Sequence, residues 1–439
     1  IDSSPLANDV RLRAAFAFSS GANDLAGFEC SLDGSEYAPC ESPFTQLLRE
    51  EGVHTFAVRA IDSNGLVDPT PAEFSWSEDR VWAGAETFSS DCAIASDGTL
   101  WCWDALTGSP ETAVSQNVPV QVGEEADWLA IASNSRSSNH NFAGSAENVC
   151  GIRDDGGTNS LWCWGFGLSV AGATVSNTPR RALEDGFAQL SLENGSACGI
   201  KLDGSLWCVG TAEQLGTGSV IDSNRVVRVG DANDWVDVSV DSGATCGIRQ
   251  QGNERNAYCW GRTSAGDPGN DTTTLLLRPT RVGAESDWVD LASNSSMTCG
   301  IRSEGGGTLW CFGQYILEAA VLDVPTQLVP ESGWVKIEGA HSGLCALEDE
   351  GSLWCWGANI PLILGTGDPL PIIVDRLPVR LDGSEVWTDF AFNSGDDILC
   401  AVNTAGELNC RGGPVETSLG GGLLDGADET YGPVISDGP

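Results

Sequence analysis

The stretch Cys345–Gly357, CALEDEGSLWCWG, decides the fold because variants of it recur along the chain. Two other copies are DCAIASDGTLWCW at 91–103 and CGIKLDGSLWC at 198–208. Seven copies occur, and their first cysteines are 58, 48, 48, 53, 46 and 55 residues apart. Self-similarity with a period of roughly 20 to 50 residues is typical of repeat architectures, in which each repeat is one supersecondary unit.

Each copy follows an apolar segment that begins with an aromatic residue. These residues are Trp82, Trp128, Phe187, Trp235, Trp288, Trp334 and Trp387. Several of the segments follow a Pro-containing stretch such as Val118–Gly123 or Leu377–Asp382. One period therefore holds about four short strands separated by turns, which is the organisation of a β-propeller blade. We expect the aromatic residues to pack between blades, because their burial removes a large apolar area from water.

The cysteines of each copy flank a predicted hairpin. In the four copies with a spacing of ten, the midpoint is followed by Gly98, Gly204, Gly351 or Gly406. A three-residue hairpin loop favours glycine in the left-handed conformation at its third position. With that loop, both cysteines lie opposite one another on antiparallel strands, close enough to form a disulfide.

All 16 cysteines fall into eight close pairs, one of them outside the repeats. The predicted disulfides are Cys30–Cys40, Cys92–Cys102, Cys150–Cys163, Cys198–Cys208, Cys246–Cys259, Cys299–Cys311, Cys345–Cys355 and Cys400–Cys410. Zinc sites favour shorter spacings with a second pair nearby, so zinc is the weaker interpretation. Disulfides persist in oxidising compartments, so we expect an extracellular or cell-surface protein whose signal peptide has been removed before Ile1.

The charge is strongly acidic: 62 acidic and 22 basic residues give a net charge of −40. Such a surface repels nucleic acids and anionic lipids. No apolar run is long enough to span a membrane. The acidity fits either adaptation to a saline exterior or recruitment of calcium. Weak calcium candidates are Asp62, Asn64 and Asp68, with a second loop at Asp267–Asp271, although an ordinary Asx turn explains both stretches.

The sequence predicts no enzyme, no catalytic residue and no cofactor other than possible calcium. The three histidines are His54, His140 and His341, and none has a metal-ligand partner at a suitable spacing. No Gly-x-Ser-x-Gly elbow and no phosphate-binding Gly-rich loop occur. Pairing of every cysteine leaves no thiol nucleophile.

Residues 80–439 resemble the regulator of chromosome condensation repeat family, in a bacterial-type, cysteine-paired form. The resemblance rests on the repeated Asp-Gly and Leu-Trp-Cys-Trp-Gly pattern. It also rests on Gln214–Gly218 and Leu364–Gly367, which look like the family's Gly-Gln-Leu-Gly-x-Gly turn. It implies a seven-bladed β-propeller. The guanine-nucleotide exchange of nuclear members does not transfer, because the cysteines depart from their pattern and the acidity opposes chromatin binding.

The C-terminus and the N-terminal region complete the predicted architecture. Gly432–Gly438 resembles Leu377–Gly383, so we expect it to pair into the first blade and close the ring. Residues 1–79 contain alternating segments such as Arg13–Phe18 and His54–Ala60, which are typical of half-buried strands. The run Phe28–Gly34 through Pro43, and Gly52–Phe56 followed by Arg59–Asp62, are similar to immunoglobulin-like modules of bacterial surface proteins. We therefore expect a small immunoglobulin-like β-sandwich at 1–79 before the propeller at 80–439.

Two functions remain open from the sequence. The first is an extracellular structural protein that self-assembles into a surface filament, tube or coat, with Ile1–Asp9 as a docking strand. The second is a monomeric adhesin or receptor that binds another extracellular protein, a peptide or a glycan through propeller loops. The long segments Ser133–Asn148 and Gly261–Thr274 are the predicted recognition loops.

Overall fold

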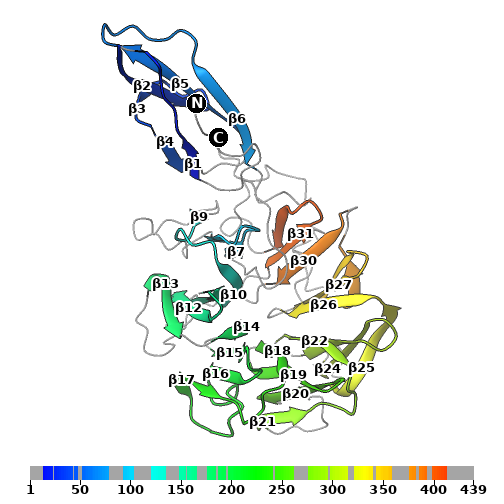
Figure 1. The fold of residues 1–439 in the computed structure, drawn as a ribbon. Coiled ribbons are helices and arrows are strands. Elements are labelled where there is room, and N and C mark those ends of the chain that lie inside the picture. Colours follow the sequence, from blue (N-terminus) through cyan, green and yellow to red (C-terminus); the bar gives the residue numbers. More distant parts are fainter. Residues whose placement is uncertain are drawn as a thin grey trace, which may run out of the picture. The chain divides into compact units, whose positions relative to one another are not determined.

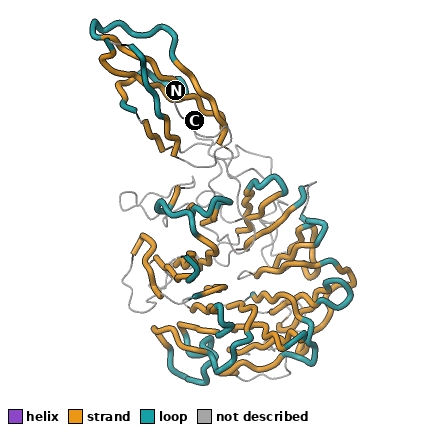
Figure 2. Tube along the Cα trace, viewed as in Figure 1, coloured by secondary structure: helices purple, strands orange, loops and turns teal. Residues whose placement is uncertain are grey.

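The computed structural model is an all-β protein that divides into two compact units, residues 1–81 and 82–437. In the described residues every regular element is a strand, and no helix is long and apolar enough to cross a membrane (Figure 2). The described residues are 13–22, 24–42, 44–47, 52–78, 92–102, 120–134, 148–154, 156–165, 176–183, 186–193, 196–240, 243–261, 275–294, 297–314, 321–339, 343–357, 375–381, 385–392 and 398–412.

The first unit contains two antiparallel sheets. One has the strand order β3-β2-β5-β6 and the other pairs β1 with β4. The strands are β1 (Arg13–Phe16), β2 (Leu25–Leu32), β3 (Ala38–Cys40), β4 (Phe44–Leu47), β5 (Gly52–Asp62) and β6 (Ala72–Glu78). Phe16 and Phe56 are fully buried and stack with ring centroids 4.0 Å apart. This aromatic core holds the two sheets together.

The second unit contains seven described sheets that follow the seven sequence repeats. Five have four strands and two have three. The strands, sheet by sheet, are β7 (Cys92–Ile94), β8 (Leu100–Cys102), β9 (Val120–Gln121); β10 (Trp128–Asn134), β11 (Asn148–Asp154), β12 (Asn159–Gly165), β13 (Ser176–Leu183); β14 (Phe187–Glu193), β15 (Ser196–Lys201), β16 (Leu206–Gly210), β17 (Ser223–Arg228); β18 (Trp235–Val240), β19 (Ala244–Gln251), β20 (Glu254–Gly261), β21 (Leu276–Arg281); β22 (Trp288–Ser293), β23 (Met297–Arg302), β24 (Thr308–Gln314), β25 (Val321–Ser332); β26 (Trp334–Gly339), β27 (Gly343–Glu348), β28 (Leu353–Gly357), β29 (Asp375–Arg380); and β30 (Trp387–Phe392), β31 (Ile398–Asn403), β32 (Leu408–Gly412).

These sheets have the meander connectivity of propeller blades. Each is antiparallel with its strands in chain order. The strands β10, β14, β18, β22, β26 and β30 lie innermost, and each contacts the next one along the chain. Figure 1 shows the sheets in chain order around a common centre. Trp82 and the predicted closing strand Gly432–Gly438 lie outside the described residues.

Seven of the eight predicted disulfides are present in the described part of the chain. Five join the second and third strands of a four-stranded sheet, and Cys92–Cys102 joins β7 and β8, the first two described strands of their sheet; in all six pairs the cysteines lie directly opposite one another with Cα atoms 3.9–4.1 Å apart. Cys400 is also disulfide-bonded and lies opposite Cys410 in the register. Cys30–Cys40 differs, because Cys30 is opposite Ala38 and the bridge spans a diagonal with Cα atoms 5.8 Å apart.

The predicted three-residue hairpin loop with glycine at its third position is confirmed. Gly98, Gly204, Gly351 and Gly406 have φ between 75° and 83°, and each closes a three-residue loop. In one of them, the N–H of Gly204 donates to the carbonyl of Lys201, 2.8 Å away. A Cβ on Gly204 would lie 2.3 Å from the carbonyl oxygen of Asn233 at the start of the next sheet. Glycine is therefore required both by the backbone conformation and by the close approach of the neighbouring sheet.

The residues after the glycine continue the turn into a hydrogen-bonded relay. Ser205 donates its hydroxyl to Asp203 Oδ1 at 2.6 Å, and its backbone N–H donates to the same oxygen at 2.9 Å. Trp207 Nε1 donates to Ser205 Oγ at 2.8 Å. Asp97, Thr99 and Trp101 repeat the arrangement in the first described sheet. The repeated Asp-Gly-Ser/Thr-Leu-Trp pattern thus provides hydrogen-bond partners both for the backbone of the turn and for the indole N–H.

The leading aromatic residues pack between sheets, as expected. Trp128 belongs to one buried cluster with Ile94 and Leu100 of the preceding sheet. Trp235 packs in the same way against Ile200 and Leu206. Trp128 and Trp235 are each at most 4% exposed, so the sheets of the second unit share continuous apolar interfaces.

Candidate functional site

The weak calcium candidates of the first unit form ordinary Asx turns. Asp62 Oδ1 accepts the N–H groups of Asn64 and Leu66, both at 2.8 Å. Asp68 Oδ1 accepts the hydroxyl of Thr70 at 2.7 Å and its N–H at 2.9 Å. The Leu66 N–H and the Thr70 hydroxyl are the largest causes that lower the pKa values of Asp62 and Asp68. In the part of the chain that the structure describes, no three His, Cys, Asp or Glu residues are grouped to hold a metal.

Of the other candidate residues, His54 is buried beside an aspartate, and the rest lie outside the residues that the structure describes. His54 is 5% exposed, and its Nδ1 lies 2.8 Å from Asp33 Oδ2. His140, His341, the loop Asp267–Asp271 and almost all of the two predicted recognition loops lie outside the described residues.

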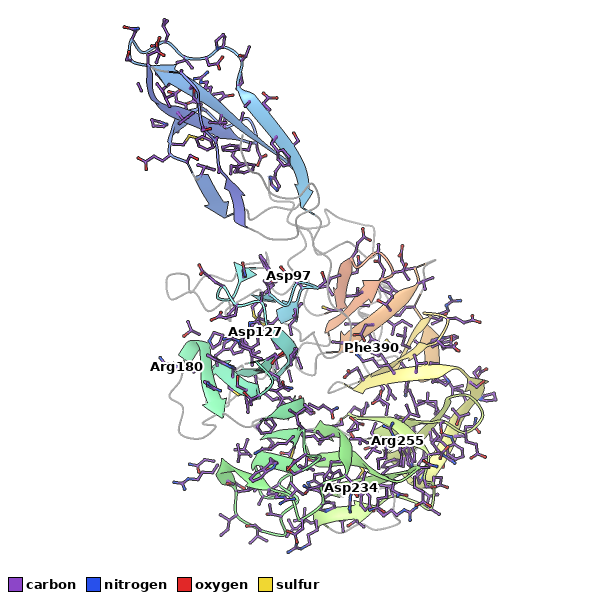
Figure 3. All side chains as sticks on the ribbon, in the orientation of Figure 1. Asp97, Asp127, Arg180, Asp234, Arg255 and Phe390 are labelled. Atoms are coloured by element: carbon purple, nitrogen blue, oxygen red, sulfur yellow. A yellow bond between two sulfur atoms is a disulfide. The ribbon has the colours of Figure 1, made fainter. Side chains whose placement is uncertain are left out.

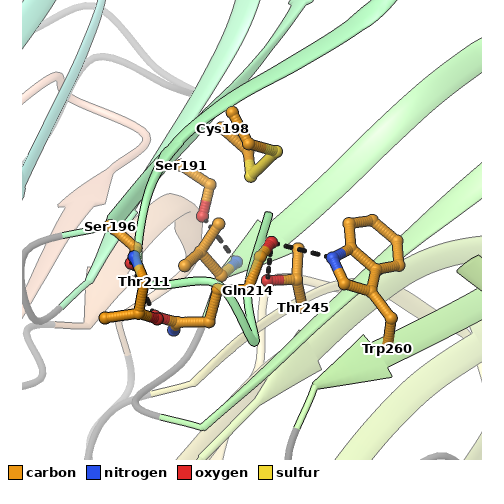
Figure 4. Close-up of a disulfide and its surroundings, with 9 residues drawn as sticks. Ser191, Ser196, Cys198, Thr211, Gln214, Thr245 and Trp260 are labelled. Carbon is orange, nitrogen blue, oxygen red and sulfur yellow. Dashed lines mark hydrogen bonds between the residues drawn. A yellow bond between two sulfur atoms is a disulfide. The ribbon is translucent and has the colours of Figure 1, made fainter. Parts of the chain in front are cut away.

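Residues 211–222 between β16 and β17 form a loop that contains the Gln214–Gly218 turn, for which the sequence predicts no binding role, and hydrogen bonds hold this loop from several sides. Gln214 Oε1 accepts the hydroxyls of Ser196 at 2.6 Å and Thr211 at 2.7 Å within the same sheet. Its carbonyl accepts Trp260 Nε1 at 2.8 Å and Thr245 Oγ1 at 3.3 Å from the next sheet (Figure 4). The Gln-Leu-Gly-x-Gly turn is therefore a connection between two sheets.

The glycines of this loop allow the close approach. Gly216 has φ 66°, and a Cβ there would lie 2.8 Å from the indole nitrogen of Trp260. Gly218 donates its N–H to the carbonyl of Leu277 on β21, 2.7 Å away. Ala212 N–H donates to Asp222 Oδ1 at 2.8 Å, which joins the two ends of the loop. The loop is thus anchored at its base, at its middle and on the neighbouring sheet.

The anchored loop presents two apolar side chains to solvent. Val220 is 76% exposed and Ile221 is 73% exposed, the two highest values among the large apolar side chains described. Their backbone is ordered locally, because the Ile221 N–H donates to Ser219 Oγ at 3.0 Å. Adjacent apolar side chains on a rigid loop are typical of a surface that contacts another protein. The sequence signal that could have revealed it is the apolar pair directly after the Gly-x-Gly turn.

A second feature is the central channel, a cavity of about 560 Å³ between the innermost strands. Its lining includes Gln189, Asp237, Asp290, Lys336 and Asp389, which stand two positions after the leading aromatic residue of five successive sheets. A β-bulge follows each of these aromatic residues and shifts the register.

The side chains at this repeated position connect three of the four successive pairs of these sheets. Gln189 Nε2 donates to Asp237 Oδ1 at 2.8 Å. The N–H of Ile337 donates to Asp290 Oδ2 at 2.9 Å. Lys336 Nζ donates to Asp389 Oδ1 at 2.6 Å and to the carbonyl of Phe390 at 2.7 Å. We call these five residues the channel belt; Figure 3 labels Arg255, which also lines the channel, and Phe390, which follows Asp389 in the chain.

Burial and the proximity of other acids raise the pKa values of several carboxyl groups in the channel. Burial raises the pKa of Asp237, and burial together with the charge of Asp237 raises that of Asp290 well above its usual range. Burial likewise raises the pKa of Glu338. For Lys336, burial acts to lower the pKa, but the carboxylates of Glu338 and Asp389 outweigh it and the pKa is raised. The folded protein therefore favours a positive charge at Lys336 and disfavours full ionisation of the acids.

Comparison with known proteins places the fold. No family model matches the sequence, and no curated protein matches it. Among solved structures, human WBSCR16 is similar with a TM-score of 0.58 and 16% identity, covering 77% of this chain and 94% of that one. Prp20p from Saccharomyces cerevisiae, whose structure was determined with its binding properties to Gsp1p and histones, has a TM-score of 0.55 and 12% identity, covering 90% and 93%.

The same yeast protein, described as RCC1 (Prp20), was also solved bound to Kap60. It covers 90% of each chain at 12% identity with a TM-score of 0.55. At these identities the likeness concerns the fold and not the activity. The second unit of this chain has an RCC1-like β-propeller fold.

Proposed function

We propose that this chain is a non-catalytic protein-binding module of an oxidising, extracellular environment, and that residues 211–222 are its contact surface. The observation that supports this proposal is the exposed pair Val220 and Ile221 on a loop anchored to two sheets. A rigid loop loses little conformational entropy on binding, so its apolar contacts contribute more fully to affinity.

The proposed architecture is a seven-bladed ring preceded by an immunoglobulin-like unit. Seven described sheets that match seven sequence repeats support the blade number. The two sheets of the first unit around Phe16 and Phe56 support a small sandwich. The extracellular location is supported by the seven disulfides, because reducing compartments do not maintain such bonds. In this arrangement the propeller presents the contact loop and the first unit is a spacer.

The net charge of the chain favours a partner other than a second copy of the same chain. At a net charge of −40, two copies repel one another at low ionic strength. The yeast structures concern binding to different proteins, Gsp1p, histones and Kap60. Self-assembly into a filament, tube or coat stays a prediction. Sedimentation velocity at low and high salt, with and without calcium, tests it directly, since ordered association under any of these conditions would identify a second copy as the partner.

Photo-crosslinking tests the contact surface. A photoreactive residue replaces Val220 in the full chain, and the matched control carries it at Leu66, which is 70% exposed on a turn of the first unit. After irradiation with extracellular material from the source cells, we expect a discrete adduct from position 220 and none from position 66. Equal adducts from both positions, or none from position 220, would reject the proposal.

A further inference from the structure

The channel contains more acids than cations that can neutralise them. The acids of the lining are Glu193, Asp237, Asp290, Glu338 and Asp389, whereas its described cations are Lys336 and Arg255. The Lys336 ammonium serves one side of the channel: it bonds Asp389 Oδ1 at 2.6 Å and lies 3.4 Å from Glu338 Oε1. That side therefore has its own donor.

On the side of the channel around Asp237, no described ammonium or guanidinium group donates a hydrogen bond to this carboxylate. Asp237 is 8% exposed, and its Oδ1 accepts Gln189 Nε2. Its Oδ2 and the neighbouring Gln189 Oε1 are buried with no hydrogen-bond partner. Arg255 donates Nη2 to the carbonyl of Val289 at 2.9 Å, its Nε is buried without a partner, and its charge acts to lower the pKa of Asp237 without a hydrogen bond to it. Two adjacent acceptors, one of them on a carboxylate, thus lack hydrogen bonds, which is a costly arrangement for buried groups.

Asp290 adds a second carboxyl group to the channel beside Asp237. It stands on β22, the innermost strand next to that of Asp237, and both its oxygens are used by backbone N–H groups of Leu291 and Ile337. The charge of Asp237 raises the pKa of Asp290, since like charges in a low-dielectric site repel, and neither carboxylate neutralises the other.

We propose that the channel binds a small organic cation, whose guanidinium or primary ammonium group donates to Asp237 Oδ2 and Gln189 Oε1. Such a group supplies both the missing donors and the missing charge. The cavity of about 560 Å³ is large enough for a molecule of this class. A metal ion fits less well, because the described residues form no cluster of three metal ligands. This site is separate from the 211–222 loop and does not depend on it.

Calorimetric titration of the full chain with agmatine, which has both a guanidinium and an ammonium group, tests the proposal. We expect saturable binding that raises the melting temperature. Tetramethylammonium, a cation without N–H donors, should not reproduce it. Asp237→Asn keeps an oxygen for Gln189 Nε2 and removes the charge, so it should weaken agmatine binding about tenfold or more. The control Glu350→Gln removes one charge from an exposed hairpin loop and should leave binding unchanged.

Three results would overturn the proposal. They are no agmatine binding by the folded wild-type chain, equal binding of tetramethylammonium, and equal agmatine affinity in Asp237→Asn and Glu350→Gln. The first two outcomes need no variant, so the test survives if Asp237→Asn fails to fold. The absence of agmatine binding would show that the acceptors do not hold such a cation, and equal binding of tetramethylammonium would show that N–H donors are not required.

Discussion

The backbone N–H of Trp128 donates to the carbonyl of Gly98, 3.1 Å away, and so joins the hairpin loop of one sheet to the first strand of the next. Trp235 and Gly204 form the same bond at 3.1 Å, and Trp387 and Gly351 form it at 2.9 Å. The two most conspicuous elements of the repeat, the Asp-Gly turn and the leading aromatic residue, therefore belong to a single interface between neighbouring sheets.

Substitution of the loop glycine tests this interface. Gly204→Ala should destabilise the second unit by about 2 kcal/mol or more, because φ is 75° and the new Cβ would meet the carbonyl of Asn233. The control is Gly252→Ala, where φ is 64° but no atom lies within 4 Å. Urea unfolding measures both. Equal losses would show that the backbone conformation alone, and not the contact between sheets, requires the glycine.

The Ser205 relay gives a second prediction. Ser205→Ala leaves the indole of Trp207 without its acceptor and should cost about 1–2 kcal/mol of unfolding free energy. Ser205→Thr should be close to wild type, since Thr99 and Thr308 play this part toward Trp101 and Trp310.

The same variant should change a carboxyl pKa. The Ser205 hydroxyl is the largest cause that lowers the pKa of Asp203. In Ser205→Ala this pKa should therefore rise toward its ordinary value, which NMR titration can follow. An Asp203 pKa that does not move would contradict the relay.

Asp237→Asn should make the stability less dependent on pH. The folded-state pKa of Asp237 lies above its unfolded value, so ionisation disfavours folding and wild-type stability falls as the pH rises through the folded pKa. The amide variant escapes this loss. Its gain in melting temperature should be largest above the folded-state pKa of Asp237 and vanish below about pH 4, where the unfolded carboxyl is also protonated.

Glu350→Gln is the reference for that experiment, since Glu350 is exposed outside the channel. Lys336, Glu338, Asp290 and Arg255 face the same cavity, so the comparison is between two complete pH profiles and not between single values. A gain for Asp237→Asn that persists unchanged at low pH would refute the assigned cause.

Lys336→Met should be among the most destabilising channel substitutions. It leaves Asp389, which is 3% exposed, without the ammonium at 2.6 Å, and breaking one partner of a buried pair costs about 3 kcal/mol or more. The double variant Lys336→Met/Asp389→Asn should recover part of the loss, because position 389 no longer carries an uncompensated charge, although Glu338 still loses its cation. Additive losses in a double-mutant cycle would show that the two groups do not interact.

The local parts of the fold were predictable from sequence because short-range chemistry determines them. Glycine after Asp97 or Asp203 specifies a three-residue loop, and that loop specifies which cysteines face each other. The burial of Trp128 and Trp235 follows from their size and their recurrence.

The site features were not predictable because they depend on contacts between sheets. Strict alternation along a strand says nothing of the bulge after Trp235, which sets the position of Asp237 in the channel belt. Likewise, Gln214 is a plain turn residue in the sequence, and only the fold brings its carbonyl to Trp260, 46 residues away. The pairing of Lys336 with Asp389 is equally non-local.

The measurement that tests the protein-binding account most directly is competition for the adduct formed from position 220. Excess unlabelled wild-type chain should abolish the cross-link. The variant Val220→Ser/Ile221→Ser, with an unchanged melting temperature, should not, because it lacks the two exposed apolar side chains. If the variant competes as well as the wild type, the 211–222 loop is not the contact surface and the central claim is wrong.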